Sequence, residues 1–130
     1  MREIKFRMWN TKTQMMYCDT GITSLGINDA IQNALNNNYV VMQYTGLRDK
    51  NGTEIYEGDI VQVEEVNKAD KKTFCTHKVV WNNDLLCFTL DNYYNPYYNY
   101  PDMAFSERES DCQTWLEIIG NIYENQELFQ

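Results

Sequence analysis

The chain has 130 residues, a length typical of one domain with a single hydrophobic core. Its formal net charge is −8, which disfavours general binding to nucleic acid, because nucleic acid carries a dense negative charge of its own. The sequence contains no C-x-x-C pair and no apolar run near the roughly 20 residues of a membrane span, so we expect a soluble cytoplasmic protein without a membrane anchor.

The first third of the chain predicts two kinds of element. Residues 3–8 alternate strictly between polar and apolar side chains, which indicates a half-buried strand with Ile4, Phe6 and Met8 on its apolar face. Residues 14–17 are expected to return as its partner strand. The helical spacing of apolar residues over 28–37 predicts one short helix.

The middle of the chain predicts strands separated by tight turns. Residues 39–44 form a predicted strand, and the sequences at 49–52 and 57–59 are typical of turns because they combine Asp or Asn with Gly. Further strands are predicted at 60–64, 73–81 and 85–90.

The end of the chain predicts a closing strand over 115–123, bent at Gly120, and one helical turn within 124–129. About six to eight short strands with regularly spaced turns favour a mainly β protein, either a small barrel or a sandwich.

Three segments of the sequence together resemble the YopX family of phage and prophage proteins: residues 2–9, residues 42–61 and residues 118–125. The resemblance extends from the first predicted strand to the last, so we expect a single YopX-like domain over residues 1–130. It implies an SH3-like barrel with extra strands, and a phage gene product that works in the cytoplasm of a bacterial host cell.

No catalytic centre is evident in the sequence. His77 is the only histidine, it has no carboxylate beside it in the sequence, and no hydrolase or phosphate-binding motif occurs. Cys75 and His77 would share one face of a strand, and we expect them to be structural residues rather than zinc ligands. We therefore expect no enzyme activity, no metal and no cofactor.

A group of carboxylates near the two turns leaves one alternative open. Asp49, Glu54, Glu57 and Asp59 could hold a divalent cation as paired carboxylates, and Asp49, Glu54 or Asp59 could then support a metal-assisted hydrolase. The favoured interpretation is that these carboxylates accept backbone N–H groups in the turns.

Several side chains near the turns are not required by turn geometry and are candidates for ligand binding. They offer an amide, aromatic rings and a guanidinium, which are groups that stack on a nucleobase or bind a phosphate. The candidates are Gln43, Tyr44, Arg48, Tyr56 and, later in the chain, Trp81.

A tyrosine-rich loop over residues 91–105 is a candidate interface. Tyrosine gives a large rigid contact area at a low entropic cost, although these rings could instead complete the protein's own core. The sequence has no Lys or Arg over 79–107, which counts against single-stranded nucleic acid as a ligand. The interface candidates are Tyr93, Tyr94, Tyr97, Tyr98 and Tyr100.

These observations favour a non-enzymatic phage accessory protein that forms a homo-oligomer. It would bind and sequester a host protein or a small nucleotide-type signal, as a factor that counters host defence. The alternative is a regulatory or DNA-transaction module whose acidic surface mimics DNA.

Overall fold

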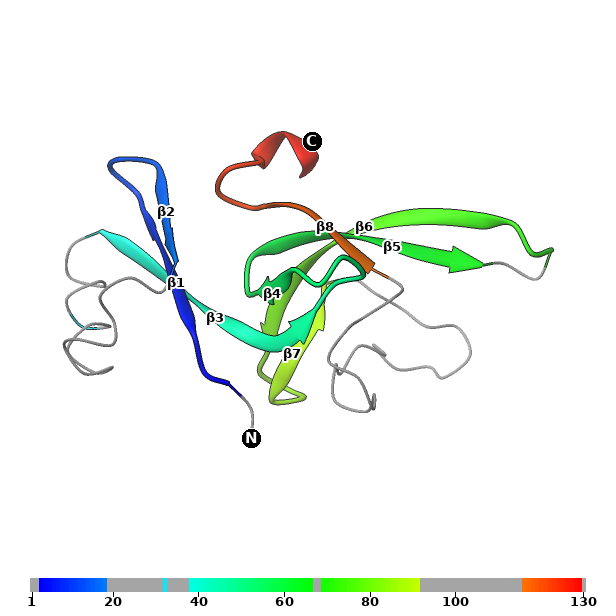
Figure 1. Cartoon of the computed structure of the whole chain (residues 1–130), viewed down its shortest axis with the longest axis horizontal. Helices are drawn as coiled ribbons and strands as arrows, with labels where there is room; N and C mark the ends of the chain where they lie inside the picture. The colour runs from blue at the N-terminus through cyan, green and yellow to red at the C-terminus, as the bar shows by residue number, and fades with distance from the viewer. Residues whose placement is uncertain (1–2, 19–31, 33–37, 67–68, 92–115, 130) are drawn as a thin grey trace. The chain divides into compact units, whose positions relative to one another are not determined.

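The computed structural model describes residues 3–18, 32, 38–66, 69–91 and 116–129 (Figure 1). The mainly β prediction is confirmed, and the strand pairs β1–β2, β1–β3, β5–β6, β5–β8 and β6–β7 are antiparallel. The helix predicted at 28–37 lies outside the described residues apart from Gln32, so it stays a prediction. The elements are β1 (Phe6–Asn10), β2 (Met15–Cys18), β3 (Tyr39–Arg48), β4 (Glu54–Tyr56), β5 (Asp59–Val66), β6 (Lys72–Asn82), β7 (Cys87–Leu90), β8 (Leu116–Asn121) and the 3-10 helix η1 (Gln126–Phe129).

The chain divides into two compact units, Met1–Tyr44 and Thr45–Gln130. The division falls within β3, so this strand contributes residues to both units. The expectation of a single domain over residues 1–130 stays a prediction. No helix in the described part of the chain is long and apolar enough to cross a membrane.

In the first unit, β1 lies between β2 and β3. The expected burial of β1 was wrong: Arg7 and Trp9 are buried, Phe6 and Met8 are half-buried, and Ile4 is 59% exposed. Arg7 lies opposite the buried Met42 of β3, and Trp9 shares its face. An indole buries more apolar area than the other β1 side chains, and the aliphatic stem of an arginine can pack beside it.

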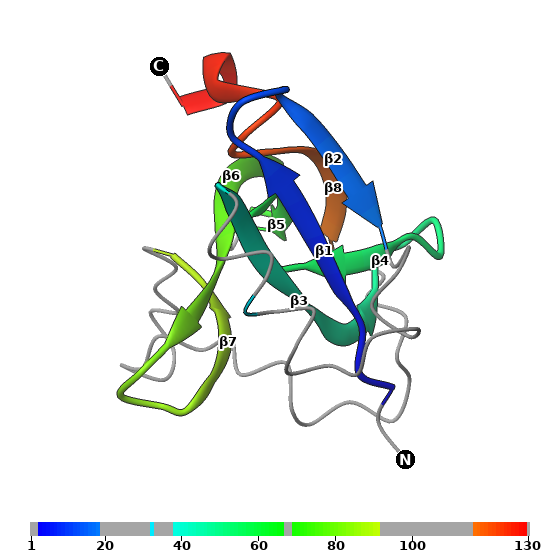
Figure 2. The ribbon, with the colours of Figure 1, turned by 90° about the vertical axis from the view of Figure 1, so that its left-hand side faces the viewer.

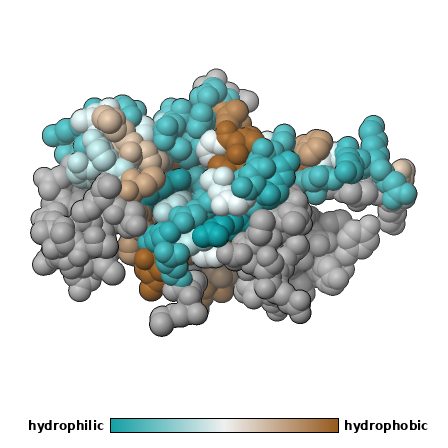
Figure 3. Space-filling model, viewed as in Figure 1, coloured by the Kyte–Doolittle hydropathy of each residue, from teal (hydrophilic) through white to brown (hydrophobic). Residues whose placement is uncertain are grey.

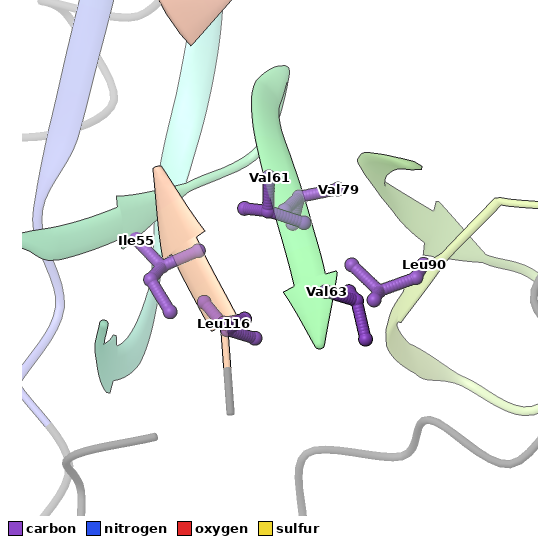
Figure 4. Close-up of a cluster of buried hydrophobic side chains, with 6 residues drawn as sticks. All are labelled: Ile55, Val61, Val63, Val79, Leu90 and Leu116. Carbon is purple, nitrogen blue, oxygen red and sulfur yellow. The ribbon is translucent and has the colours of Figure 1, made fainter. Parts of the chain in front are cut away.

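The second unit contains a four-stranded sheet in the order β7-β6-β5-β8. The interior of the second unit is a cluster of fully buried aliphatic side chains that come from five different strands (Figure 4). These strands curl around one apolar interior, which confirms the small barrel-like β fold. The cluster consists of Ile55, Val61, Val63, Val79, Leu90 and Leu116.

The pairing of β5 with β8 contains one irregularity. Ile60 pairs with Gly120 and Val61 pairs with Ile118, so Ile119 is an extra residue in a β-bulge. This bulge lies next to Gly120, where the sequence predicts a bend in the closing strand. The predicted partner strand at 14–17 and the final helical turn are confirmed by β2 and η1.

One predicted strand begins later than expected. The strand predicted over 85–90 starts at Cys87, because Leu85 and Leu86 belong to the turn that follows β6. The Asn82 side chain extends this turn, since its Oδ1 accepts the backbone N–H groups of Asp84 and Leu85, both at 2.9 Å. Leu86 has a φ of 55°, in the left-handed region that leucine rarely adopts.

Candidate functional site

The Asp49 carboxylate is almost fully buried and is occupied by backbone donors. Its Oδ1 accepts the N–H groups of Asn51 and Thr53 at 2.9 Å each, and its Oδ2 accepts the N–H of Ile118 at 3.0 Å. The first two bonds hold the turn between β3 and β4, and the third reaches β8. The interpretation of Asp49 as a turn residue is therefore confirmed.

The turn at Asp49 also covers the edge of β8 that faces away from β5. The N–H of Lys50 donates to the Leu116 carbonyl at 3.1 Å, next to the bond from Ile118 to Asp49. Glu117 accepts a bond from the Asn51 side chain and forms an ion pair with Lys50, both at 3.2 Å. The bonds to Leu116 and Ile118 satisfy backbone groups that an edge strand otherwise leaves unpaired.

The second turn uses its carboxylate in the same way. Asp59 is buried, and its Oδ2 accepts the backbone N–H of Tyr56 at 2.8 Å. The nearby Glu54 accepts a bond from the Tyr56 hydroxyl at 3.2 Å. The described residues contain no group of three or more His, Cys, Asp or Glu side chains placed to hold a metal ion.

The segment after β8 is also built from side-chain bonds to the backbone. Asn125 Oδ1 accepts the N–H of Asn121 at 3.1 Å, and Asn121 Oδ1 accepts the N–H groups of Tyr123 and Glu124. A Cβ on Gly120 would lie 2.5 Å from Asn125 Oδ1, so a side chain there would force the Asn125 side chain to shift. Polar residues in the second and third YopX-like segments thus bond to the backbone and hold the turns of the fold, namely Asp49, Asp59, Asn121 and Asn125.

Two of the predicted ligand-binding aromatics are core residues. Tyr44 is 3% exposed and Tyr56 is 7% exposed, so neither presents a ring face for stacking at the surface. Lys5 Nζ lies 5.6 Å from the centre of the Tyr44 ring. Gln43 is half-buried and neighbours Tyr44 on β3, so the two side chains point to opposite faces of the sheet.

The remaining predicted ligand-binding residues belong to the second unit. Arg48 is half-buried, and Trp81 on β6 is 43% exposed. The grouping of these residues with Gln43, Tyr44 and Tyr56 into one ligand site stays a prediction. The predicted interface tyrosines lie outside the described residues, namely Tyr93, Tyr94, Tyr97, Tyr98 and Tyr100.

The His77 ring is tied to the end of β7. Its Nδ1 lies 2.8 Å from the Asp91 carbonyl oxygen, and the Asp91 carboxylate accepts the N–H of Lys78 at 2.6 Å. Cys75 and His77 lie opposite Val63 and Val61 of β5. These contacts bond the His77 ring to the backbone next to β7, and its assignment as a structural residue rather than a zinc ligand stays a prediction.

The turn between β6 and β7 carries an exposed apolar surface that sequence reasoning missed in part. Leu86 is 73% exposed and Leu85 is 46% exposed, and Trp81 precedes the same turn. We call these three residues the hairpin tip. The turn lies at the lower end of the hairpin in both Figures 1 and 2. Two adjacent leucines directly after an Asn-Asn-Asp turn were the signal available in the sequence.

Trp81 is held by the strand opposite. It pairs with Phe88 across the hairpin, and the two rings meet edge to face with centroids 5.1 Å apart and planes at 76°. Phe88 is buried, so it anchors the indole while much of Trp81 stays exposed. By contrast, much of the described surface in Figure 3 is hydrophilic.

The comparisons with known proteins agree with the fold and the sequence segments. A family model described as YopX protein matches residues 5–130. The crystal structure of protein EF1440 from Enterococcus faecalis is 25% identical in sequence, covers 100% of both chains and superposes with a TM-score of 0.62. No curated protein matches the chain. The match over nearly the whole chain shows that this protein belongs to the YopX family.

Proposed function

We propose that this YopX-family protein is a non-enzymatic accessory protein of phage type that binds and sequesters a host protein. It acts in the cytoplasm of the bacterial host, as a homo-oligomer, and counters a host defence. The family membership supports the phage-type assignment.

The observation that carries the proposal is the exposed hairpin tip. Trp81, Leu85 and Leu86 place apolar side chains in solvent at one end of a hairpin. An exposed apolar group is costly in water and is typical of a surface that another protein covers. Tryptophan is also a residue that contributes strongly to binding energy at protein interfaces.

A protein target is favoured over a small nucleotide-type signal. A nucleobase needs accessible ring faces to stack on, and Tyr44 and Tyr56 are buried. The tip lies at the turn of a hairpin, whereas small ligands bind mostly in concave sites. Gln43 and Arg48 remain the residues to substitute if a nucleotide-sized ligand is found.

The alternative function, a regulatory or DNA-transaction module that mimics DNA, rests on the net charge of −8 alone. Binding of that kind would be lost at high salt and would not need the leucines of the tip. Substituting the tip therefore separates the two functions.

Native mass spectrometry of the tagged protein from bacterial cells tests the proposal. We expect an oligomer that carries a host polypeptide at a fixed stoichiometry. The control is an unrelated acidic protein with the same tag, which should not carry that polypeptide. A mass of the chain alone, or with only a nucleotide-sized addition, would contradict sequestration of a host protein.

A further inference from the structure

We infer that the hairpin tip docks on an apolar surface of a partner protein that is bordered by Lys or Arg side chains. This inference rests on the proposed function and specifies the binding surface and the chemistry of its target. It concerns Trp81, Leu85 and Leu86, which lie within one short hairpin.

The tip combines one aromatic side chain held by a buried neighbour with two exposed leucines in the adjoining turn. The Trp81 ring is fixed against the buried Phe88 at a centroid distance of 5.1 Å. Leu86 follows as the most exposed of the large apolar side chains in the described part of the chain, at 73%. Binding energy at interfaces concentrates in a few such side chains that enter pockets on the partner.

The turn holds the two leucines in place before any partner binds. Asn82 Oδ1 accepts the N–H groups of Asp84 and Leu85, which fixes the turn from within. Leu86 keeps its left-handed φ of 55° although leucine is disfavoured there. Strain of this kind clusters at functional sites, and a preformed anchor loses less entropy on binding.

The charge around the tip identifies the class of partner. Asp84 is exposed within the turn, and the described hairpin residues 79–91 include no Lys or Arg. Together with the net charge of −8, this surface repels nucleic acid and anionic lipid headgroups. An apolar tip that carries an exposed carboxylate is complementary to an apolar surface bordered by basic side chains.

A titration with a defined probe tests this assignment. The probe is a synthetic amphipathic helical peptide made of Leu and Lys, and its affinity is measured by calorimetry at low and high salt. We expect the double variant Leu85→Asn/Leu86→Asn to bind the peptide about tenfold more weakly or worse. Asparagine tolerates the left-handed conformation, so this variant keeps the turn.

The matched control is Phe74→Ser, which removes another exposed apolar side chain from β6, near the opposite end of the strand. We expect this control to change the affinity by less than about twofold, and a peptide with Glu in place of Lys not to bind. Circular dichroism checks that each variant is folded. Failure of the wild-type protein to bind the peptide, equal losses for both variants, or binding to the Glu peptide would overturn the inference.

Two further results separate this inference from the proposed function. If the tip variant still carries the host polypeptide in native mass spectrometry, the tip assignment fails and sequestration stands. If the peptide binds through the tip but no host polypeptide is found, sequestration fails and the tip assignment stands. A shift from oligomer to monomer in the tip variant would show that a second copy occupies the tip, which also overturns the inference.

Discussion

Asp49 is a single residue that ties together parts of the second unit that are distant in the sequence. Its carboxylate bonds the N–H groups of Asn51 and Thr53 in the turn and of Ile118 in β8. The sequence predicts the first two bonds, because Asp before Asn-Gly is typical of a turn. The bond to Ile118 depends on the packing of β8 beside the turn, and no local pattern encodes it.

We expect Asp49→Ala to lower the free energy of unfolding by about 3 kcal/mol or more. The substitution removes bonds to a charged acceptor and leaves three backbone donors without their partner. Urea unfolding followed by circular dichroism measures the loss. The control is Asp84→Ala, an exposed carboxylate in another turn, which should change stability by less than about 0.5 kcal/mol. Equal stability of the two variants would contradict the structural role of Asp49.

The chemistry of the aromatic residues alone did not show which of their side chains are buried and which are exposed. Tyr44 and Tyr56 have groups that suit a ligand site, and the structure buries both of them. Trp81 has similar chemistry and is exposed. The difference arises from packing, since each of these residues lies on a strand and its exposure depends on what covers that face.

At the scale of the element, the β6–β7 hairpin combines two regularly paired strands with a turn whose backbone is strained at Leu86. Its two strands pair from Val79 with Leu90 to Asn82 with Cys87. The turn beyond them places Leu86 at a φ of 55°. The sequence predicted both strands but gave the turn too few residues, because the hydrogen bonds of Asn82 extend it through Leu85.

We expect Leu86→Gly to raise the free energy of unfolding by up to about 1 kcal/mol. Leucine in the left-handed region costs about 1–2 kcal/mol, and the greater freedom of glycine in the unfolded chain offsets only part of this gain. Thermal and urea unfolding measure the change. The matched control is Leu85→Gly, where no positive φ is relieved, and it should lower stability. A loss of stability in Leu86→Gly as large as in the control would show that the turn is not strained.

At the scale of the whole molecule, β5 is one of the two inner strands of the four-stranded sheet in the second unit. It pairs with both β6 and β8, and it contributes Val61 and Val63 to the buried cluster (Figure 4). The 3-10 helix η1 at the end of the chain has exposed side chains from Gln126 to Leu128. The backbone hydrogen bonds of β5 and η1 should therefore differ in how often they open.

We expect native-state hydrogen exchange to be slowest in β5 and much faster in η1. The amides of a central strand exchange only when the surrounding sheet opens, whereas a short exposed helical turn opens locally. Exchange followed by nuclear magnetic resonance gives a rate for each amide. Protection in η1 as strong as that of Val61 and Val63 would contradict this order of stability.

Local patterns in the sequence were sufficient for the strands, the turns and the family. A period of two in apolar side chains specifies a strand, and Asp, Asn and Gly specify turns through their own backbone preferences. The segments that resemble the YopX family contain such turn residues, and many of these act on the backbone close by. These features depend on neighbours in the chain, so the sequence determines them directly.

Only the tertiary structure decided which side chains are covered. Arg7 and Tyr44 are buried while Leu85 and Leu86 are exposed, against the usual order of hydrophobicity. Burial depends on contacts between strands that are distant in the sequence, as with Arg7 opposite Met42. The apolar tip proposed as the binding surface is visible only after these contacts are made, because the same residue types fill the core elsewhere in the chain.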